Sequence, residues 1–592
     1  IAALHINNPA YSSFAAFNNP NPQSRLYIHL TDPSTECIYL GFNWAHNNVT
    51  SPAPPKITFF YQIKDPNGNV VYGPITVTPA GANIQNWSEA FGGPMQIFGP
   101  GGYNATQVTS ADLGSQGWAG KGDYYIEFQD EENNDLLIDF WDITVADCSG
   151  PGPIEKPGRV WSHNWSFFAI NDFGFPFRPF NGAFYVCAPD PDDDNKSFVT
   201  KIDFNGSGFQ PAAFNVAFNS FGAMNTGDVA VDRRSVQNMN ATQPEYSIFL
   251  NDPVDICATA SVGELEIIGI SRCSGEDYCI KFTITKAGQV DLLLDFNGPD
   301  NVYTPNTADI LLSQTVTAEE VGLPVCVQWD GFDGLGNPLP ENVTTQIPIT
   351  IAYAQGIYHF PIYDAEYMTN GFMISAVRPA AAVSLLFYDD SNISVASGSG
   401  EPSVQLTGCM PPCHRWTNYT QPNTPGFGNL HTINSWWFSQ LIIRQDIFFL
   451  PAYYTCEIEG PVRMCSGSTS QLTFKPILSP TGAAAAEIIS TVWSGPGIVG
   501  ANDGTSITIN DGGNYFLQVD WLTSLGDTCQ TSCDYQVTID PPLTETIDTL
   551  IVLGESVEIN GETYNEGGQY IQELTNSEGC DSILTINVII LN

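Results

Sequence analysis

The sequence predicts an all-β fold: an elongated, multi-domain chain of β-sandwich and immunoglobulin-like domains. Apolar and polar residues alternate in short runs, which is the period-two pattern of half-buried strands. Glycine and proline are abundant, with 53 and 42 copies in 592 residues, as expected where many turns join short strands. No segment keeps the 3.6-residue periodicity of a long helix. The chain is also too long for one core, so we expect about four to six domains.

The first predicted domain is a β-sandwich that covers residues 1–153. Its alternating runs include ITFFYQIKD, which ends at Asp65, and the turn cluster DPNGN follows it. Cys37 and Cys148 lie near the two ends of the segment. A disulfide between them would close one large loop and contribute about 4 kcal/mol in the chain-entropy model. The sequence SGPGPIEKPG then forms a linker, since proline and glycine extend neither helix nor strand.

Three further β segments are predicted up to residue 455. Residues 158–256 form a β-sandwich with aromatic-rich strands such as RVWSHNW. Residues 257–355 form an immunoglobulin-like domain with a candidate calcium loop and the turn WDGFDGLGN. Residues 356–455 form a β domain with the motif INSWWF. The first and third of these segments are either separate domains or two halves of one unit.

Two smaller units are predicted after residue 455. Residues 456–540 have the layout of an immunoglobulin-like domain, with an early cysteine (Cys465), a central Trp493 and a late strand before Cys529 and Cys533. Residues 541–592 form a small β repeat module. The sequence stops on a strand, so we expect the array of repeats to continue.

The composition restricts the possible environment and partners. The formal net charge is -44, with 63 acidic and 19 basic residues, which disfavours nucleic acid and anionic membrane surfaces. Fourteen cysteines in such a chain favour disulfides and an oxidising compartment. No apolar run approaches the ~20 residues that span a bilayer. We therefore expect an extracellular protein, secreted or attached to a cell surface, that does not itself insert into the membrane.

A loop after the apolar strand QVDLLL is the main candidate metal site. Asp295, Asn297, Asp300 and Asp309 offer hard oxygen ligands from a loop held at its base by a strand, and this is the chemistry that Ca²⁺ selects. The alternative is a solvated turn in which Asp and Asn side chains cap their own backbone. The loop lacks the closing Glu of an EF-hand.

A second acidic run is a weaker calcium candidate. It consists of Asp190, Asp192, Asp193 and Asp194. Several carboxylates within a few ångströms repel one another unless a counter-ion is present. The alternative is a mobile, hydrated loop.

Two pairs of nearby cysteines indicate local disulfides. Cys273 and Cys279 are expected to bracket a turn, and Cys409 and Cys413 a small loop. A zinc site built from Cys409, Cys413, His414 and His431 is the alternative for the second pair, but a short cysteine spacing in an oxidising compartment favours a disulfide.

The sequence contains no motif that identifies an enzyme. It has no G-x-S-x-G elbow, H-E-x-x-H pair or P-loop lysine motif. Gly495, Gly497 and Gly500 match G-x-G-x-x-G, but the residues after them indicate a turn and strand, so no helix N-terminus follows to bind a pyrophosphate. We expect a protein that is not an enzyme.

Tryptophans form a possible sugar-binding platform. These residues are Trp161, Trp165, Trp416, Trp436 and Trp437. Packing in a core or between domains is the favoured alternative, because each indole buries on the order of 200 Å². Trp436 and Trp437 are adjacent, so on a strand they face opposite sides.

Several motifs occur together in the order of a known family. RVWSHNW, FNGAFYV, PEYSIFLNDP, WDGFDGLGN, HFPIYDAE, GC followed by CHRW, and FGNLHTINSWW resemble the framework of large secreted surface proteins of the Bacteroidetes. Those proteins are gliding-motility-associated, are exported by type IX secretion and have adhesin-like, immunoglobulin-like repeats. The resemblance covers about residues 159–437, and the final EGCDSILTINV is similar to short repeats of the same proteins. Two features depart from the family: Cys580 has no obvious partner in its own repeat, and no sorting domain is present.

The resemblance implies an extracellular structural or adhesive protein of a bacterial surface. Such a protein would form part of a filament or adhesin that mediates attachment, motility or cell contact, as a homo-oligomer or filament that contacts a host or prey surface or a glycan. An array of carbohydrate-binding modules is the alternative function, and a secreted hydrolase is the third. Calcium is the one cofactor that we expect.

Overall fold

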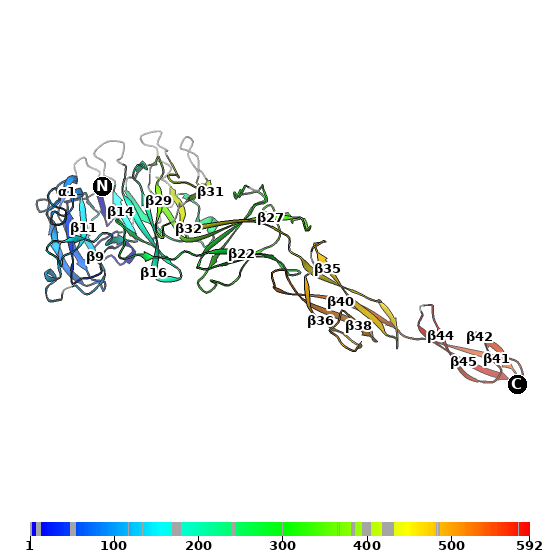
Figure 1. Ribbon diagram of the computed structural model, residues 1–592. Coiled ribbons are helices and arrows are strands. Elements are labelled where there is room, and N and C mark those ends of the chain that lie inside the picture. Colours follow the sequence, from blue (N-terminus) through cyan, green and yellow to red (C-terminus); the bar gives the residue numbers. More distant parts are fainter. Residues whose placement is uncertain are drawn as a thin grey trace.

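Figure 1 shows a computed structural model of the chain. It describes residues 3–7, 13–47, 55–116, 118–132, 134–168, 179–211, 213–237, 243–298, 300–363, 365, 367–380, 385–393, 404–416, 431–480, 482–483, 486–577 and 579–592. A broad head lies at one end of an elongated molecule, and narrower modules follow it in a line to the C-terminus (Figure 1). The predicted all-β, multi-domain fold is confirmed.

The head contains three large sheets around one apolar core. The core residues run from Leu4 to Trp437. The largest sheet has the spatial order β21 (Ala258–Thr259), β16 (Asp193–Asp203), β15 (Ala183–Asp190), β20 (Ser247–Phe249), β13 (Val160–Ser162), β2 (Leu26–Leu30), β9 (Gly122–Gln129), β6 (Phe59–Lys64) and β7 (Val70–Val77), with β29 (Met373–Arg378) paired to β16.

The other head sheets are smaller. One has the order β18 (Ala213–Ala217), β14 (Asn164–Phe168), β1 (Ala3–Ile6), β10 (Leu136–Ile138), β4 (Ala45–His46) and β5 (Lys56–Ile57). A second has the order β12 (Ile154–Glu155), β11 (Trp141–Asp147), β3 (Glu36–Phe42) and β8 (Thr106–Val108). A short pair joins β17 (Phe209–Gln210) to β28 (Tyr367–Met368).

Strands from three of the predicted segments share the head. β1 pairs with β14, and β2 pairs with β13, so residues 1–153 and 158–256 contribute to the same sheets. β29, from residues 356–455, pairs with β16. The aromatic-rich strands pack against the N-terminal strands in one core, because Trp165 is fully buried in the same apolar cluster as Leu4. This arrangement fits the possibility that 158–256 and 356–455 form one unit, and it adds the N-terminal segment to that unit.

The second sandwich packs a three-stranded sheet against part of a seven-stranded sheet. The smaller sheet has the order β22 (Leu265–Ser271), β23 (Tyr278–Ile284) and β26 (Val325–Trp329). The larger has the order β25 (Ile310–Val316), β24 (Gly288–Leu294), β27 (Gln346–Ile362), β32 (His431–Phe449), β30 (Leu386–Asp389) and β31 (Val404–Cys409), with β19 (Val236–Gln237) paired to β32. Val290, Leu292 and Leu294 all face the core between the sheets, as the period of two in a strand requires.

Two long strands connect the head to the second sandwich. β27 and β32 pair along nearly their whole lengths. The first half of β27 places Ile351 in the core of the second sandwich, and its second half places Phe360 in the core of the head. The strand changes core at Gly356, which has a φ of 60° and where a side chain would press against Phe198. The expected border at residue 355/356 therefore falls inside one continuous strand.

The third sandwich (residues 453–540) has two four-stranded sheets. Their orders are β33 (Tyr453–Glu459), β35 (Ser470–Ser479), β38 (Ser506–Ile509) and β37 (Ile498–Val499), and β34 (Arg463–Cys465), β40 (Thr528–Asp540), β39 (Gly513–Leu522) and β36 (Glu487–Ser494). Trp493 is fully buried between them. The terminal module (residues 541–592) has the sheet β41 (Leu543–Val552), β45 (Asp581–Leu591) and β44 (Gly568–Thr575), and the hairpin β42 (Val557–Ile559) and β43 (Glu562–Tyr564).

Helices are few and short in the described ranges. They are α1 (Trp87–Gly92), α2 (Met95–Phe98), α3 (Val229–Asp232) and the 3₁₀ turns Pro22–Ser24 and Ser110–Gln116. Asn86 caps α1 by accepting the N–H of Glu89 at 3.1 Å, and Asp228 caps α3 by accepting the N–H of Ala230 at 2.9 Å.

Candidate functional site: a groove beside the carboxylate loop

A groove of about 140 Å³ lies on the face of the seven-stranded sheet that points away from the core of the second sandwich. Strands β24, β27, β30 and β32 supply its wall. Trp436 lines the groove, whereas Trp437 is fully buried in the head core, because adjacent residues of a strand face opposite sides. Apolar wall residues include Leu293, Ala352, Phe387, Phe438 and Leu441. The groove is therefore mostly apolar.

A partly buried ion pair also lines this groove. Arg233 directly follows α3, and its Nη2 donates to the carboxylate of Asp291 at 2.8 Å. The guanidinium carbon lies 5.4 Å from the centre of the Trp436 ring, within cation–π range. Nε of Arg233 is buried and has no hydrogen-bond partner. An unpaired buried donor costs about 1–3 kcal/mol, so Arg233 retains hydrogen-bonding capacity for an acceptor.

The carboxylate loop, residues 295–309 between β24 and β25, forms the neighbouring rim. Its residues Asn301 and Tyr303 line the groove. The N–H of Asn301 donates to Oδ2 of Asp295 at 2.7 Å, and its side-chain oxygen accepts a hydrogen bond from Thr350 at 3.0 Å. Asp295 therefore fixes the position of a groove residue.

Two carboxylates are buried at the base of this loop. Asp295 and Asp309 are 3% and 4% exposed. Asp309 accepts the N–H groups of Asn297 and Thr304, at 2.8 and 3.0 Å. Oδ1 of Asp295 is buried without a partner. Desolvation by burial raises the pKa of Asp295, and the charges of Asp309 and Asp300 act in the same direction.

The structure brings together two of the four predicted calcium ligands, Asp295 and Asp309. Asn297 and Asp300 are exposed, and Asp300 accepts the N–H of Val302 at 2.9 Å, as a turn-capping carboxylate does. Calcium takes six to eight oxygen ligands. Among the residues that the structure describes, no group of three or more His, Cys, Asp and Glu has a metal-binding arrangement. The loop thus offers a partial calcium site, with Oδ1 of Asp295 as its unsatisfied oxygen.

The second acidic run forms the turn between β15 and β16, and its side chains have separate partners. Asp190 is buried and accepts the N–H of Asp192 at 3.0 Å. Asp194 is exposed. The N–H of Ala287 donates to the carboxylate of Asp192 at 3.0 Å. Nζ of Lys286 lies 3.8 Å from the same carboxylate, and Nζ of Lys196 forms an ion pair with Asp193 at 3.1 Å. Lysines therefore supply positive charge at this turn.

All fourteen cysteines are paired in disulfides. The pairs are Cys37–Cys148, Cys187–Cys257, Cys273–Cys529, Cys279–Cys326, Cys409–Cys413, Cys456–Cys533 and Cys465–Cys580. The first and the fifth are pairs that the sequence predicts.

The predicted disulfide between Cys273 and Cys279 is wrong. Cys279 lies on β23 and bonds to Cys326 on the adjacent strand β26. Cys273 follows β22 and contacts an apolar cluster of the third sandwich around Trp521. Its partner is consequently in another module.

Cys465, the early cysteine of the predicted immunoglobulin-like layout, forms a disulfide outside that domain. The third sandwich is closed by Cys456 and Cys533. Cys465 ends the edge strand β34 and bonds to Cys580 of the terminal module. This bond accounts for the lack of a partner for Cys580 within its own repeat.

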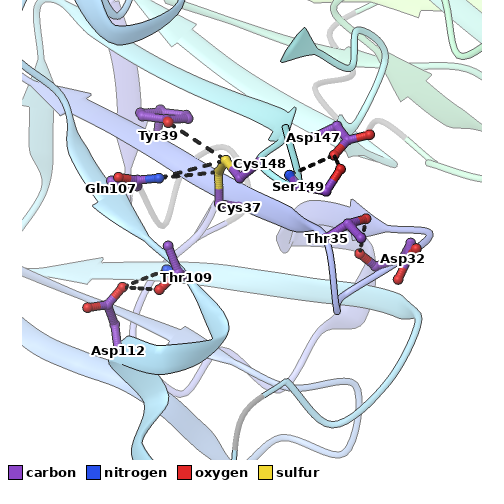
Figure 2. The surroundings of a disulfide bond; sticks show 10 residues. All are labelled: Asp32, Thr35, Cys37, Tyr39, Gln107, Thr109, Asp112, Asp147, Cys148 and Ser149. Carbon is purple, nitrogen blue, oxygen red and sulfur yellow. Dashed lines mark hydrogen bonds between the residues drawn. A yellow bond between two sulfur atoms is a disulfide. The ribbon is translucent and has the colours of Figure 1, made fainter. Parts of the chain in front are cut away.

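Figure 2 shows one disulfide of the head, Cys37–Cys148. The hydroxyl of Tyr39 points at Sγ of Cys148 at 3.7 Å, and the amide of Gln107 lies 3.6 Å from Sγ of Cys37. Tyr39 is itself buried. The bond is thus enclosed by side chains of β3 and of the segment around β8.

The structure does not support a zinc site at Cys409 and Cys413. Their sulfurs are bonded to each other, so neither is a thiolate ligand. His414 is buried and makes hydrogen bonds to Ser435 at 2.6 Å and Asp390 at 3.1 Å.

The tryptophans that suggested a sugar platform are packing residues. All five are buried, with exposed fractions from 0% to 9%: Trp161, Trp165, Trp416, Trp436 and Trp437. Two exposed aromatic side chains occur on α1, where Trp87 is 50% and Phe91 is 74% exposed. Their i, i+4 spacing is the signal in the sequence that identifies this pair.

Comparisons with known proteins give low similarity throughout. No protein-family model and no curated protein matches the chain. Among solved structures, a 1.5-MDa bacterial ice-binding adhesin aligns with 56% of this chain and 98% of its own, at 10% identity and a TM-score of 0.18. A tetra-tandem repeat from the extending region of a large adhesion protein aligns with 86% of this chain and 98% of its own, at 11% identity and a TM-score of 0.12.

A third solved structure is a Ca²⁺-stabilized adhesin that helps an Antarctic bacterium bind ice. It aligns with 86% of this chain and 95% of its own, at 9% identity and a TM-score of 0.15. The first and third are described as adhesins of bacteria, and the second as part of a large adhesion protein. Separately, no helix within the described ranges is long and apolar enough to cross a membrane.

Proposed function

We propose that the chain is an extracellular structural and adhesive protein of a bacterial cell surface that carries tensile load along its length. The observation that carries this proposal is the order of its disulfides. Five of them form what we call the disulfide relay: Cys37–Cys148, Cys187–Cys257, Cys273–Cys529, Cys456–Cys533 and Cys465–Cys580.

The relay provides a short covalent route through the whole molecule. From residue 1 the route follows the segments 1–37, 148–187, 257–273, 529–533, 456–465 and 580–592, with a disulfide at each junction. It contains about a fifth of the 592 residues, so most of the chain is bypassed when the ends are pulled. The other two disulfides lie within bypassed segments. Tension therefore passes from the second sandwich to the third, and from the third to the terminal module, through sulfur–sulfur bonds, and it passes from the head to the second sandwich along residues 257–273.

Noncovalent contacts stiffen the junctions between the modules. β27 and β32 continue from the head into the second sandwich. Beside the Cys273–Cys529 bond, Lys281 forms an ion pair with Asp527, and the guanidinium of Arg272 lies 4.9 Å from the centre of the Tyr453 ring. Disulfides of this number are typical of extracellular proteins, which supports the proposed location.

Calcium binding at Asp295 and Asp309 is a further part of the proposal. The unsatisfied Oδ1 of Asp295 supports it, because a buried carboxylate oxygen without a donor is stabilised by a cation. A bound ion would hold the carboxylate loop, and with it Asn301 at the rim of the groove. Calcium here would stiffen the second sandwich.

The finer assignments come from the family resemblance. They comprise a Bacteroidetes source, type IX secretion, gliding motility, immunoglobulin-like repeats and assembly into a homo-oligomer or filament. The Cys465–Cys580 bond removes one argument for assembly, since Cys580 is not free to join another copy. Sedimentation of the purified chain at micromolar concentration tests assembly, and a single monomer species would contradict it.

Retention under flow tests the adhesive function. Beads coated with the oxidised chain are expected to resist detachment from surfaces covered with cells or polysaccharide at shear rates that remove albumin-coated beads. Beads coated with the Cys409→Ser/Cys413→Ser variant should behave like wild type, because this disulfide lies off the relay. Detachment at the albumin threshold on every surface would overturn the proposal.

A further inference from the structure

Four large apolar side chains are exposed together at one end of the head. We call this set the aromatic tip: Trp87 and Phe91 on α1, and Met95 and Phe98 on α2. Their exposed fractions are 50%, 74%, 39% and 51%, respectively. The rings of Trp87 and Phe91 stack at 5.0 Å between centroids and an angle of 17°. α1 lies in the head, at the opposite end of the molecule from the C-terminus (Figure 1).

The segment that bears the aromatic tip is held firmly. Glu89 accepts the N–H of Gln85 at 2.7 Å and the side-chain amide of Asn86 at 2.9 Å, which completes the cap of α1. The N–H of Met95 donates to the carbonyl of Tyr103 at 2.9 Å, and the N–H of Tyr103 donates back to Gly93 at 3.0 Å. These bonds close the segment onto itself.

Tyr103 anchors this segment to the head. It is 2% exposed and its hydroxyl donates to Asp142 at 2.6 Å. It belongs to the apolar cluster that contains Cys37 and Ala146 and against which Ala90 packs. Ala90 thus faces inward while its neighbour Phe91 faces solvent. The tip rings are presented on a fixed base, which reduces the entropy lost when a ligand binds.

The exposed area is large for side chains that do not stabilise the fold. Three half-exposed aromatic rings present on the order of 300 Å² of apolar surface, which is in the range of functional patches on monomers. Within the described part of the head, the backbone of this segment is closed by hydrogen bonds and by Tyr103, and these contacts do not involve the exposed faces of Trp87 and Phe91. These exposed faces are therefore accessible to a ligand.

The rim of the aromatic tip indicates what that ligand is. Between residues 83 and 107 the sequence has one charged residue, Glu89, and no Lys or Arg. Exposed amide side chains lie on the same segment instead and are hydrogen bonded within it: Gln85, Asn86, Gln96 and Asn104. An anionic ligand would need cations, and the chain carries a net charge of -44. Amide groups both donate and accept hydrogen bonds, as sugar hydroxyl groups require, and a flat ring pairs with the apolar face of a pyranose.

We propose that the aromatic tip binds neutral glycans, with a pyranose ring stacked on Trp87 or Phe91 and its hydroxyl groups bonded to the amides of the rim. The proposal rests on the adhesive function proposed above and names the surface chemistry that the head contacts. It differs from the platform predicted from the sequence, whose tryptophans are buried.

Binding of the oxidised full chain to a printed array of neutral oligosaccharides, such as glucans, mannans and galactans, tests this inference. Wild type is expected to bind at least one neutral glycan, and Trp87→Ala and Phe91→Ala to weaken that binding at least tenfold with an unchanged Tm. The matched control is Phe516→Ala, which removes a 53% exposed ring of the third sandwich and should leave binding unchanged.

Three outcomes would overturn the inference. They are binding that Trp87→Ala leaves intact, no neutral glycan bound by wild type, and Trp87-dependent binding to phosphatidylcholine vesicles or to a second copy in place of glycan. If glycan binding is absent while coated beads still resist shear, only the glycan inference fails. If the beads also detach, the adhesive function fails with it.

Discussion

Cys273 of the second sandwich is bonded to Cys529 of the third sandwich, 256 residues further along the chain. Cys273→Ser/Cys529→Ser removes the covalent link at this junction. We expect a lower Tm, since a loop of this length contributes about 5 kcal/mol in the chain-entropy model, and a broader distribution of molecular dimensions in small-angle X-ray scattering. Cys409→Ser/Cys413→Ser removes a disulfide whose cysteines are only 4 positions apart in the sequence, so it should leave the molecular dimensions unchanged. Identical scattering for both variants would show that the junction does not depend on its disulfide.

Trp437 and Trp87 allow a matched test of packing against exposure. Trp437 is fully buried in the head core and stacks on Tyr358, so Trp437→Ala should lower the free energy of unfolding by about 3–5 kcal/mol. Trp87 is half exposed, and Trp87→Ala should change the free energy of unfolding by less than about 0.5 kcal/mol. Chemical denaturation of the oxidised chain measures both. A large loss for Trp87→Ala would mean that the aromatic tip is part of the fold.

Calcium should stabilise the second sandwich through Asp295. Millimolar Ca²⁺ is expected to raise Tm, and chelation to lower it, because a ligand that binds only the native state stabilises it by mass action. Asp295→Asn should abolish the response. Asp300→Asn, which changes an exposed turn-capping carboxylate, should keep most of it. A Tm that does not respond to calcium or chelator in wild type would refute the site.

His359 should make the head sensitive to mild acid. Burial, with a smaller effect from the charge of Arg233, lowers the pKa of this histidine to about 3. The unfolded chain binds the proton near its ordinary pKa of about 6.5, so the unfolded state binds more protons than the folded state between these values. The stability contributed by neutral His359 is therefore present above pH 6.5 and is lost as pH falls toward 3, by at most about 1.4 kcal/mol per pH unit.

His359→Gln should flatten the dependence of unfolding free energy on pH between 7 and 5. Part of the slope should remain, because burial also lowers the pKa of His163. The window stays above the range in which most carboxylates titrate. An unchanged slope would show that His359 gains a proton in the folded head without cost.

Local patterns predict the strands of this chain, but they do not predict which strands pair in the same sheet. The run QVDLLL predicts β24, and its alternate residues do face a core, since the period of two is a property of each strand. The pairing of β1 with β14 joins residues more than 150 positions apart, and nothing local specifies it. The cysteine pairs show the same limit: near neighbours such as Cys409 and Cys413 are predictable, whereas the partner of Cys273 depends on the packing of two modules.

The candidate site is predictable to a similar extent. The loop sequence identifies Asp295 and Asp309 as carboxylates at strand ends, but it does not show that Asn297 and Asp300 point to solvent. Neither does it show the groove, whose Arg233 and Trp436 come from distant segments. Adjacent tryptophans on one strand do predict that Trp436 and Trp437 face opposite sides, and they do so.

Single-molecule force spectroscopy, with the oxidised full chain pulled through residues 1 and 592, tests the disulfide relay most directly. Because only about a fifth of the 592 residues lies on the route, full extension should reach about 400 Å, compared with about 2,000 Å after reduction. Cys273→Ser/Cys529→Ser should lengthen the oxidised molecule by about 450 Å, since the route then continues through Cys279, Cys326, Cys409 and Cys413. Cys409→Ser/Cys413→Ser should not change its length. An oxidised wild-type chain that extends as far as the reduced one would contradict the account.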